Sequence, residues 1–307
     1  EGVQSIRKNP SAMSDIAFNR ILFKGTLLEE PSFGSFKTVK KIELSDVKDY
    51  YTKFYSPSVS SVVVSGDITQ EEVTAKLSFL KNWTNKPVTL PSLGTLPTFD
   101  KVQIYLIDKP YAPQSVVTVA ANHLPYDYNG DYFKTNVMYF PLGGNFNSRL
   151  TMNIREEHGF AYSPQSAFYG NKYFGNYFWQ ADVRTNATDS AIHEVMKEIT
   201  NYKKNGITDE ELAFTKSSLI LSDALRYESP GQKASFLSRI VTYKLPNNYV
   251  AEQINIIERL TKQDIDAIAQ KTLHPETITI IVVGHAYKIR DGLNKLGYGK
   301  VKEITLD

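Results

Sequence analysis

An ungapped internal repeat is the feature of this 307-residue sequence that most constrains its fold. The segments SDVKDYYTKFYSPSVSSVVVSGD (45–67) and QDIDAIAQKTLHPETITIIVVGH (263–285) align at an offset of 218 residues, which is 263 minus 45. Each copy predicts a capped helix, a connection that contains proline, and a β-branched strand that ends at glycine. The alternative is that a common helix–turn–strand unit arose twice. We interpret the match as an internal duplication.

A second match extends the repeat towards the N-terminus. NPSAMSDIAFNRI resembles SPGQKASFLSRI, and Pro10 and Pro230 each stand in the first turn of a predicted helix. Residues 1–83 therefore correspond to residues 220–307. The proline-rich stretch 84–100 is predicted to be an extended linker.

The repeat predicts three parts. Residues 1–83 are expected to be the C-terminal part of a first, truncated α+β domain, 84–100 the linker, and 101–307 a complete second domain. On this arithmetic, a complete first copy would begin at position −117, which is 101 minus the offset of 218 and lies about 118 residues ahead of Glu1. The chain is therefore expected to be the end of one domain followed by a whole second domain.

The second domain alternates between strand and helix patterns. β-branched content and alternation predict strands at 102–108, 114–122, 161–169, 173–183 and 277–284. Helical periodicity predicts helices at 129–140 and 147–158, followed by three or four amphipathic helices between about 187 and 272. This order predicts an α+β fold in which helices pack on one face of a mainly antiparallel sheet.

The composition excludes several classes of function. Hydrophobic residues make up 41% and charged residues 22%, which is typical of a soluble globular protein. The net charge of +2 gives no broad basic surface for nucleic acid, and no apolar run approaches the roughly 18 residues of a membrane span. The absence of cysteine excludes disulfides, thiol catalysis and cysteine-ligated zinc.

The histidines and acidic clusters do not predict a metal site. A metal site needs converging ligands, often two histidines at helical spacing, and no two of the five histidines stand three or four residues apart. His158 follows Glu156 and Glu157 and is better explained as a surface histidine near a helix C-terminus. We expect no metal ligands in this chain.

The segment GGNFNSRLTMNIREEHGFAY (143–162) carries the candidate chemistry. Its glycines do not indicate a nucleotide site, because no G-x-x-x-x-G-K-[ST] motif is present. Asn147 or Ser148 is expected to cap the following helix. Arg155 and Tyr162, seven residues apart, could hold a peptide carbonyl or the oxyanion formed when it is attacked. Alternatively, Arg155 pairs with a neighbouring carboxylate and Tyr162 is half-buried.

The same segment resembles the pitrilysin family of inverted zinc peptidases, which includes insulin-degrading enzyme and the mitochondrial processing peptidase. The family pattern G-G-x-x-x-S-R-L-x-x-x-(I/L)-R-E-x-x-G-x-x-Y is matched at each fixed position from Gly143 to Tyr162. RKNPSAMSDIAFNRILF, YYTKFYSP, SVVVSGD and ITIIVVG follow in family order. The resemblance therefore covers essentially the whole chain, and it explains the repeat as a pair of α+β domains of about 200 residues each.

The resemblance implies a peptidase in which two such units close around an extended or unfolded peptide. It implies that Arg155 and Tyr162 hydrogen-bond the substrate backbone near the cleaved bond. Gly143, Gly144 and Asn145 are expected to contribute to substrate binding. Zinc would be held by an H-x-x-E-H motif, with its glutamate as the general base, and by a distal glutamate. The family also has frequent bacterial envelope members, so a periplasmic location is expected.

The chain departs from the family pattern in lacking H-x-x-E-H. Glu1 stands nine residues before Pro10, where a spacing of eight is expected for the distal ligand, so it is not assigned as one. We expect a fragment or subunit that binds peptide, with zinc and base supplied by a complementary half. The alternatives are a unit whose metal motif has decayed, a non-catalytic homologue acting as partner or scaffold, and a peptide-binding module suggested by aromatic content alone.

Overall fold

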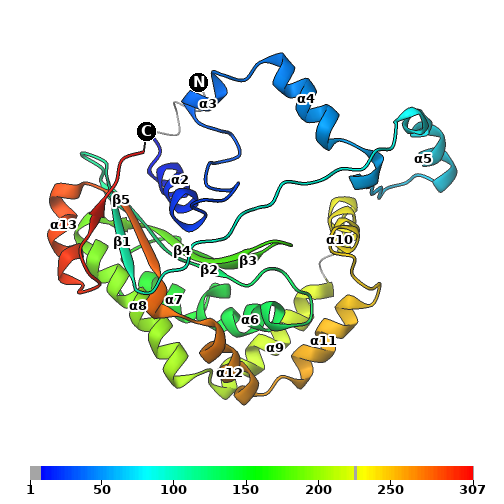
Figure 1. The fold of residues 1–307 in the computed structure, drawn as a ribbon. Coiled ribbons are helices and arrows are strands. Elements are labelled where there is room, and N and C mark those ends of the chain that lie inside the picture. Colours follow the sequence, from blue (N-terminus) through cyan, green and yellow to red (C-terminus); the bar gives the residue numbers. More distant parts are fainter. Residues whose placement is uncertain (1–7, 225–226, 307) are drawn as a thin grey trace. The chain divides into compact units, whose positions relative to one another are not determined.

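The computed structural model describes residues 8–224 and 227–306, and it divides into two compact units (Figure 1). Unit 1 comprises Glu1–Phe36, Leu93–Lys216 and Asn255–Asp307. Unit 2 comprises Lys37–Ser92 and Ser217–Ile254. The divisions after Lys216 and Ile254 fall inside two helices, α9 (Asp209–Ala224) and α11 (Tyr249–Arg259).

Unit 1 is built on a six-stranded mixed sheet with the order β3-β4-β2-β5-β1-β6. Pairing is antiparallel between β3 and β4, β4 and β2, and β2 and β5, but parallel between β5 and β1 and between β1 and β6. The strands are β1 (Gln103–Asp108), β2 (Gln114–His123), β3 (Gln165–Gly170), β4 (Gly175–Arg184), β5 (Thr279–Gly284) and β6 (Lys302–Glu303). The α+β class is therefore confirmed, and the five predicted strands are present.

The parallel pairing of β1 was not foreseen from the sequence. Strand pairs that are joined by a short turn must be antiparallel, whereas strands joined by a long crossover can adopt either orientation. β1 ends at Asp108 and β5 begins at Thr279, so their sequences do not fix the orientation. Burial on both faces explains why β5 reads as a continuous β-branched run.

Helices of unit 1 cover both faces of this sheet (Figure 1). On one face lie α6 (Asp131–Tyr139), α8 (Thr188–Asn205), α12 (Lys262–Thr272) and α13 (Ala286–Lys295). The Thr188 hydroxyl donates to Ser115 Oγ at 2.9 Å, and the Tyr202 hydroxyl donates to the Met138 carbonyl at 2.8 Å. These buried bonds fix α8 against β2 and α6.

The opposite face is covered by α2 (Pro10–Leu22). Its Met13 and Ala17 pack on alternate residues of three strands, namely Ile107, Val116, Ile281 and Val283. The prediction that helices pack on one face of the sheet holds for α6, α8, α12 and α13, the helices of residues 101–307 named above. The helix expected to belong to the first domain supplies the cover of the second face.

The compact units differ from the boundaries expected from the repeat. Residues 10–22 pack on the sheet formed by residues 101–307, because Ser14 and its neighbours meet the apolar face of β2 and β5. Residues 84–99 form no helix or strand, and the Pro97 carbonyl accepts from Asn122 Nδ2 at 3.1 Å. Spatial units do not test ancestry, so the assignment of 1–83 to a truncated domain stays a prediction.

Unit 2 contains the first copy of the repeat. Helix α4 (Leu44–Phe54) and the short 3-10 turn η1 (Pro57–Val59) recur as α12 and η7 (Pro275–Thr277), each at the offset of 218. Both helices begin with a capping box, closed by Asp46 in α4 and by Asp264 in α12. These coincident boundaries support the repeat.

The predicted strand of the first copy is not formed. Residues 60–64 are extended but pair with no described strand, whereas the equivalent residues of the second copy form β5 between β1 and β2. A strand exists only through a partner, because an isolated extended chain leaves its backbone groups to water. The first copy has the sequence of a strand but no described partner.

Three helices of unit 2 have no buried side chain among their described residues. They are α4, α5 (Gln70–Lys76) and α10 (Pro230–Tyr243). The turns α3 (Phe36–Val39) and η2 (Ser78–Asn82) complete this part of the chain. Most of the buried apolar side chains therefore lie in unit 1, although Leu245 and Tyr249 of unit 2 are also buried.

We expect His123 to make unit 1 sensitive to acid. His123 ends β2 and packs edge to face on Phe168, with ring centroids 4.4 Å apart, and burial lowers its pKa from 6.5 to about 4. The unfolded chain therefore takes up the proton at a higher pH than the folded chain. Stability should fall as the pH drops from 6.5 towards 4, by at most about 3 kcal/mol.

The measurement is the free energy of unfolding in urea across this pH range. His123→Phe keeps a ring against Phe168 and should remove most of the fall, whereas His193→Gln, at an exposed position, should leave it unchanged. Equal slopes in the wild-type protein and His123→Phe would contradict the assignment.

Candidate functional site

The glycine pair lies in a π-helical turn, η3 (Phe140–Gly144), that directly follows α6. A Cβ atom on Gly143 would lie 2.1 Å from the buried Tyr139 hydroxyl oxygen, so only glycine fits there without a shift. Asn145 holds the next turn, since its Nδ2 donates to the Phe140 carbonyl at 2.6 Å and its Oδ1 accepts from the Asn147 amide at 2.8 Å. Gly143 and Asn145 thus shape this loop.

The helix that follows begins as α7 (Arg149–Thr151) and continues as the π-helical η4 (Met152–Glu157). Ser148 occupies the N-cap position, but its hydroxyl donates to Thr151 Oγ1 at 3.0 Å and accepts no capping hydrogen bond from a helix amide. Leu150 and Ile154 are buried, as predicted. π-helical turns are rare and are frequent at functional sites.

Arg155 and Tyr162 come together at the end of this helix. The Arg155 guanidinium carbon lies 4.9 Å from the centroid of the Tyr162 ring and 4.7 Å from that of Phe146. The cation therefore lies over two aromatic rings, a favourable electrostatic arrangement. The sequence pattern pairs Arg155 with Tyr162, but the place of Phe146 in the loop offers no signal for a role.

The two members of the pair differ in exposure. Arg155 Nε lies 3.0 Å from Glu156 Oε1, so the predicted pairing with a neighbouring carboxylate is present. Tyr162, however, is 79% exposed rather than half-buried, while the Arg155 side chain is 27% exposed. The Arg155 side chain is thus mostly covered by the protein, whereas the Tyr162 side chain is mostly exposed to solvent.

A fixed turn joins the two residues. Gly159 has a φ of 59°, in the left-handed region that favours glycine. The Phe160 amide then donates to the Ile154 carbonyl at 2.9 Å, and Ala161 forms a bridge with Val183 of β4. These contacts attach the Tyr162 backbone to the sheet, so the position of the phenol relative to Arg155 is set by the fold.

His158 lies at the end of η4, as predicted. Its ring stacks on Phe160 with centroids 4.8 Å apart, and its Nε2 lies 4.0 Å from Glu194 Oε2. In the part of the chain that the structure describes, no group of three histidine, aspartate or glutamate residues could hold a metal ion. Glu1 lies outside the described residues. The described residues therefore do not fit the zinc site of the peptidases.

Arg149 anchors the start of the same helix. Its Nε and Nη2 donate to the two carboxylate oxygens of Glu211 at 2.6 and 2.7 Å, and Nη2 also donates to the Gly206 carbonyl at 3.0 Å. The guanidinium lies over the Tyr202 ring at 4.7 Å. Glu211 is the third residue of α9, and an acidic residue at that position is expected only to favour the start of the helix. The sequence therefore did not predict this fork.

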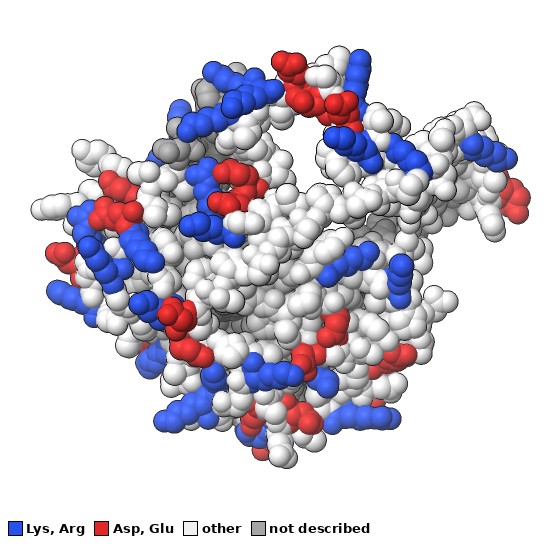
Figure 2. Space-filling model, viewed as in Figure 1, with Lys and Arg blue, Asp and Glu red and all other residues white. Residues whose placement is uncertain are grey.

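The distribution of charged side chains on the surface agrees with the near-neutral net charge of the sequence. Figure 2 shows Lys and Arg interspersed with Asp and Glu over the face that it presents. Among the described residues, no helix has the length and apolar character needed to cross a membrane.

The fold places helices on both faces of a mixed sheet, and the described residues form no group that could hold a metal ion. A family model described as "Peptidase M16 inactive domain" matches residues 41–219. The chain therefore belongs to this family of M16 peptidase domains, as the resemblance to the pitrilysin group implied.

Curated relatives carry both enzymatic and non-enzymatic names. The "Non-peptidase homolog YmxG" of Helicobacter pylori is 26% identical over 280 residues, covering 90% of this chain and 63% of the relative. An uncharacterized zinc protease of Streptomyces coelicolor is 24% identical over 270 residues, covering 83% of this chain and 57% of the relative. The chain thus spans about three fifths of the length of these two relatives.

Solved structures share the fold. The M16 peptidase inactive domain from Pseudomonas fluorescens superposes with a TM-score of 0.78 at 20% identity, covering 92% of this chain and 68% of that one. A protease from Helicobacter pylori gives a TM-score of 0.79 at 16% identity, with coverage of 91% and 68%. The first half of the periplasmic protease PqqL from Escherichia coli gives 0.72 at 15% identity, with coverage of 99% and 70%.

We expect the Arg149–Glu211 fork to stabilise unit 1. Arg149→Ala should lower the free energy of unfolding by about 2 kcal/mol, between the values of exposed and buried pairs, because both side chains are about three-quarters covered. Arg149→Lys keeps the charge but loses the two-pronged bond, and should have an intermediate effect. Urea unfolding at neutral pH measures these differences.

Acid should weaken the same fork. Burial raises the pKa of Glu211, but hydrogen bonds from Arg149 and Thr208 outweigh it and leave the pKa below 4.5. The stability from this carboxylate is therefore present above pH 4.5 and lost as the pH falls below it. Arg290→Ala, which removes an exposed pair with Glu303, is the control and should change stability little. If Arg149→Ala lowered the free energy of unfolding as little as Arg290→Ala does, the anchoring role of Arg149 would be excluded.

Proposed function

We propose that this chain is the peptide-binding part of a pitrilysin-type peptidase, and that it grips polypeptide backbone through Arg155 and Tyr162. The observation that supports this most is that the Arg155 guanidinium lies over the ring of Phe146 and over that of an exposed Tyr162. The zinc ion and the general base belong, on this proposal, to a complementary half or subunit.

The chemistry of the two side chains suits a carbonyl oxygen. Arg155 uses Nε towards Glu156, which leaves the N–H groups of its two terminal nitrogens to donate outward. The Tyr162 hydroxyl supplies a further donor beside them. Both groups would hold a substrate carbonyl, and they would hold the oxyanion more strongly once the carbonyl is attacked, because charge then develops on the oxygen they face.

Phe146 limits the movement of the cation. An arginine side chain loses rotational freedom when it binds, and contact with two rings restricts that freedom beforehand. Gly143, Gly144 and Asn145 support the loop that carries Phe146. We propose that they take part in substrate binding through this loop.

The alternative is a non-catalytic homologue that acts as a partner subunit or scaffold. The family description "inactive domain" and the relative named a non-peptidase homologue favour it. Other relatives are named zinc proteases. In either case the proposed partners are a polypeptide and a complementary half, with no role for nucleic acid. The cell envelope is proposed as the location, a setting shared by the periplasmic protease of similar fold.

We expect substitutions at the pair to weaken polypeptide handling. Arg155→Ala or Tyr162→Phe, tested in the complete assembly, should lower peptide turnover about 10- to 1000-fold, the range for losing one oxyanion donor. In a non-catalytic assembly, the matching readout is affinity for an unfolded polypeptide such as reduced, carboxymethylated casein, which should fall at least several-fold.

Matched variants separate the pair from general surface effects. Tyr173→Phe removes the hydroxyl of another exposed tyrosine, and Arg259→Ala removes a cation on α11. Both should behave like the wild-type protein, and Arg155→Lys should restore little because it lacks the planar fork. Unchanged turnover and affinity in both Arg155→Ala and Tyr162→Phe would sink the assigned roles.

Metal analysis distinguishes the peptidase from the scaffold. The 307-residue chain alone should bind no stoichiometric zinc and cleave no peptide, whereas an assembly with its complementary half should contain zinc and lose activity with a chelator. An assembly that contains no zinc but still binds polypeptide supports the scaffold. Stoichiometric zinc in the chain alone would contradict the placement of the metal elsewhere.

A further inference from the structure

Helix α10 and the turn before it line a pocket of about 560 Å³ in unit 2. The described residues that line this pocket, which we call the α10 pocket, all lie between Tyr227 and Tyr249. Its volume falls within the range of roughly 300–1,000 Å³ that is typical of pockets for small molecules. Arg155 and Tyr162 are not among the residues that line it.

Three aromatic rings form part of the lining of the α10 pocket. The Phe236 ring meets the Tyr227 ring edge to face, with centroids 4.8 Å apart and planes at 73°. The same ring stacks on that of Tyr249, with centroids 5.5 Å apart and planes at 21°. Tyr249 is only 3% exposed, so the stack fixes Phe236 to the body of unit 2. Rings held in this way offer a preformed surface to another planar ring.

A cation lies in the same lining. Arg239 stands three residues after Phe236 on α10, at a spacing that puts both side chains on one side of the helix. Of the described residues that line the pocket, Arg239 alone carries a charge. Within the part of the chain that the structure describes, its guanidinium forms no ion pair and no hydrogen bond. Its planar set of donors is therefore available to an anion that enters the pocket.

The other polar groups of the lining do not compete for Arg239. The Gln232 side-chain oxygen accepts from the Ser229 amide and from the Ser229 hydroxyl, each at 2.8 Å, so this pair is occupied in starting the helix. Ser235 stands four residues before Arg239 and also lines the pocket, where its hydroxyl is a further donor. The pocket thus combines an aromatic surface with a cation and a neutral donor.

We propose that the α10 pocket binds an aromatic carboxylate. The ring of the ligand packs on Phe236 and Tyr227, and its carboxylate accepts two parallel hydrogen bonds from the Arg239 guanidinium. One guanidinium matches the single charge of a carboxylate, whereas a phosphate monoester carries a charge of about −1.5 to −2 and would remain partly unpaired. Such a ligand exists as a free aromatic acid or as the C-terminal tyrosine or phenylalanine of a polypeptide.

The inference does not depend on Arg155 or Tyr162. Their proposed role is read out by the binding of casein, and the α10 pocket is read out by small ligands. Loss of one kind of binding with retention of the other would therefore count against only one of the two proposals.

Calorimetric titration of the 307-residue chain tests the class of ligand. N-acetyltyrosine carries both the ring and the carboxylate, and it should bind with a dissociation constant in the millimolar range or below. N-acetyltyrosinamide lacks the charge and N-acetylalanine lacks the ring. The amide should bind at least about 10-fold more weakly, since it loses the hydrogen bonds between charged groups, and N-acetylalanine should also bind more weakly.

A peptide distinguishes the two sources of the carboxylate. The tetrapeptide Gly-Gly-Gly-Tyr with a free C-terminus is compared with the same peptide as its C-terminal amide. Binding of the free acid alone would identify polypeptide C-termini as ligands. Binding of N-acetyltyrosine without either peptide would identify a free aromatic acid. Both results support the chemistry assigned to the pocket.

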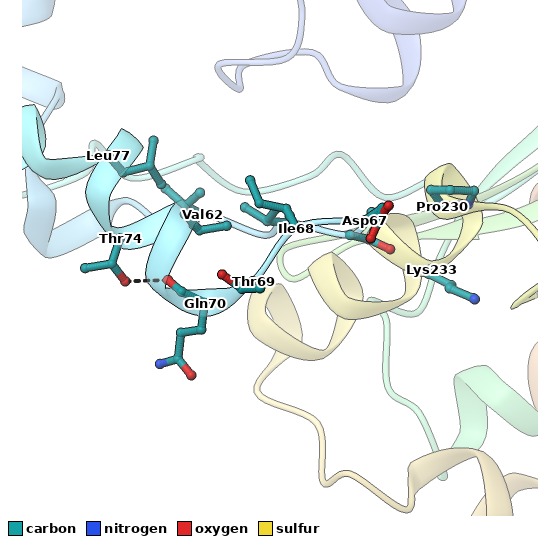
Figure 3. A pocket seen from close by; sticks show the side chains of 13 residues that line it. Val62, Asp67, Ile68, Thr69, Gln70, Thr74, Leu77, Pro230 and Lys233 are labelled. Carbon is teal, nitrogen blue, oxygen red and sulfur yellow. Dashed lines mark hydrogen bonds between the residues drawn. The ribbon is translucent and has the colours of Figure 1, made fainter.

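Matched variants test the residues. Arg239→Gln should lower the affinity for N-acetyltyrosine about 10- to 100-fold, and Phe236→Leu should lower it about 2- to 10-fold. Lys233→Gln is the control, because Lys233 is a cation of the same helix that lines a separate hollow of about 720 Å³, together with Pro230 and with residues of α5 such as Gln70 (Figure 3). It should bind like the wild-type protein.

Three results would overturn the inference. One is equal affinity for N-acetyltyrosine and its amide. Another is wild-type affinity in Arg239→Gln, a change at an exposed position whose folding is checked by its urea midpoint. The third is the absence of binding by both N-acetyltyrosine and the free-acid peptide at millimolar concentrations.

Discussion

The structure depends on the pairing of one central strand. β5 is bonded to β2 on one side and to β1 on the other, and all six of its residues are buried. α2 covers one of its faces through Ile281 and Val283, while the helices that begin with α6 cover the other. Such a strand cannot be stable outside the sheet, because its side chains and its backbone both require neighbours. The contrast with residues 61–66 shows what the same pattern becomes without them.

The site is attached to this sheet by a few short-range constraints rather than by burial. Gly143 lets the chain pass over the Tyr139 hydroxyl, Gly159 turns it back, and Ala161 bonds it to β4. Arg149 ties the intervening helix to α9 through Glu211. Arg155 and Tyr162 themselves remain at the surface. A binding site on a folded scaffold requires side chains at the surface and fixed backbone contacts that hold them in place.

Elements whose residues follow a local pattern could be predicted from the sequence, whereas features that depend on partners far along the chain could not. The alternation in β2 and the capping box of α12 gave correct elements, because strand pattern and helix start are local properties. The orientation of β1, the place of α2 on the sheet and the Arg149 fork depend on contacts far along the chain. The strand expected near Val62 is wrong for the described chain, since its pattern is local but its pairing is not.

The stack of Phe146, Arg155 and Tyr162 has a consequence for selectivity. On the proposed function, Arg155 and Tyr162 donate beside two rings, and the groups that they suit, a carbonyl oxygen and a flat amide, occur in every residue of every polypeptide. A grip of this kind would recognise that a chain is extended and accessible, and it would not distinguish one sequence from another. Any preference among unfolded polypeptides would then have to arise on other surfaces, and it could change without altering the grip itself.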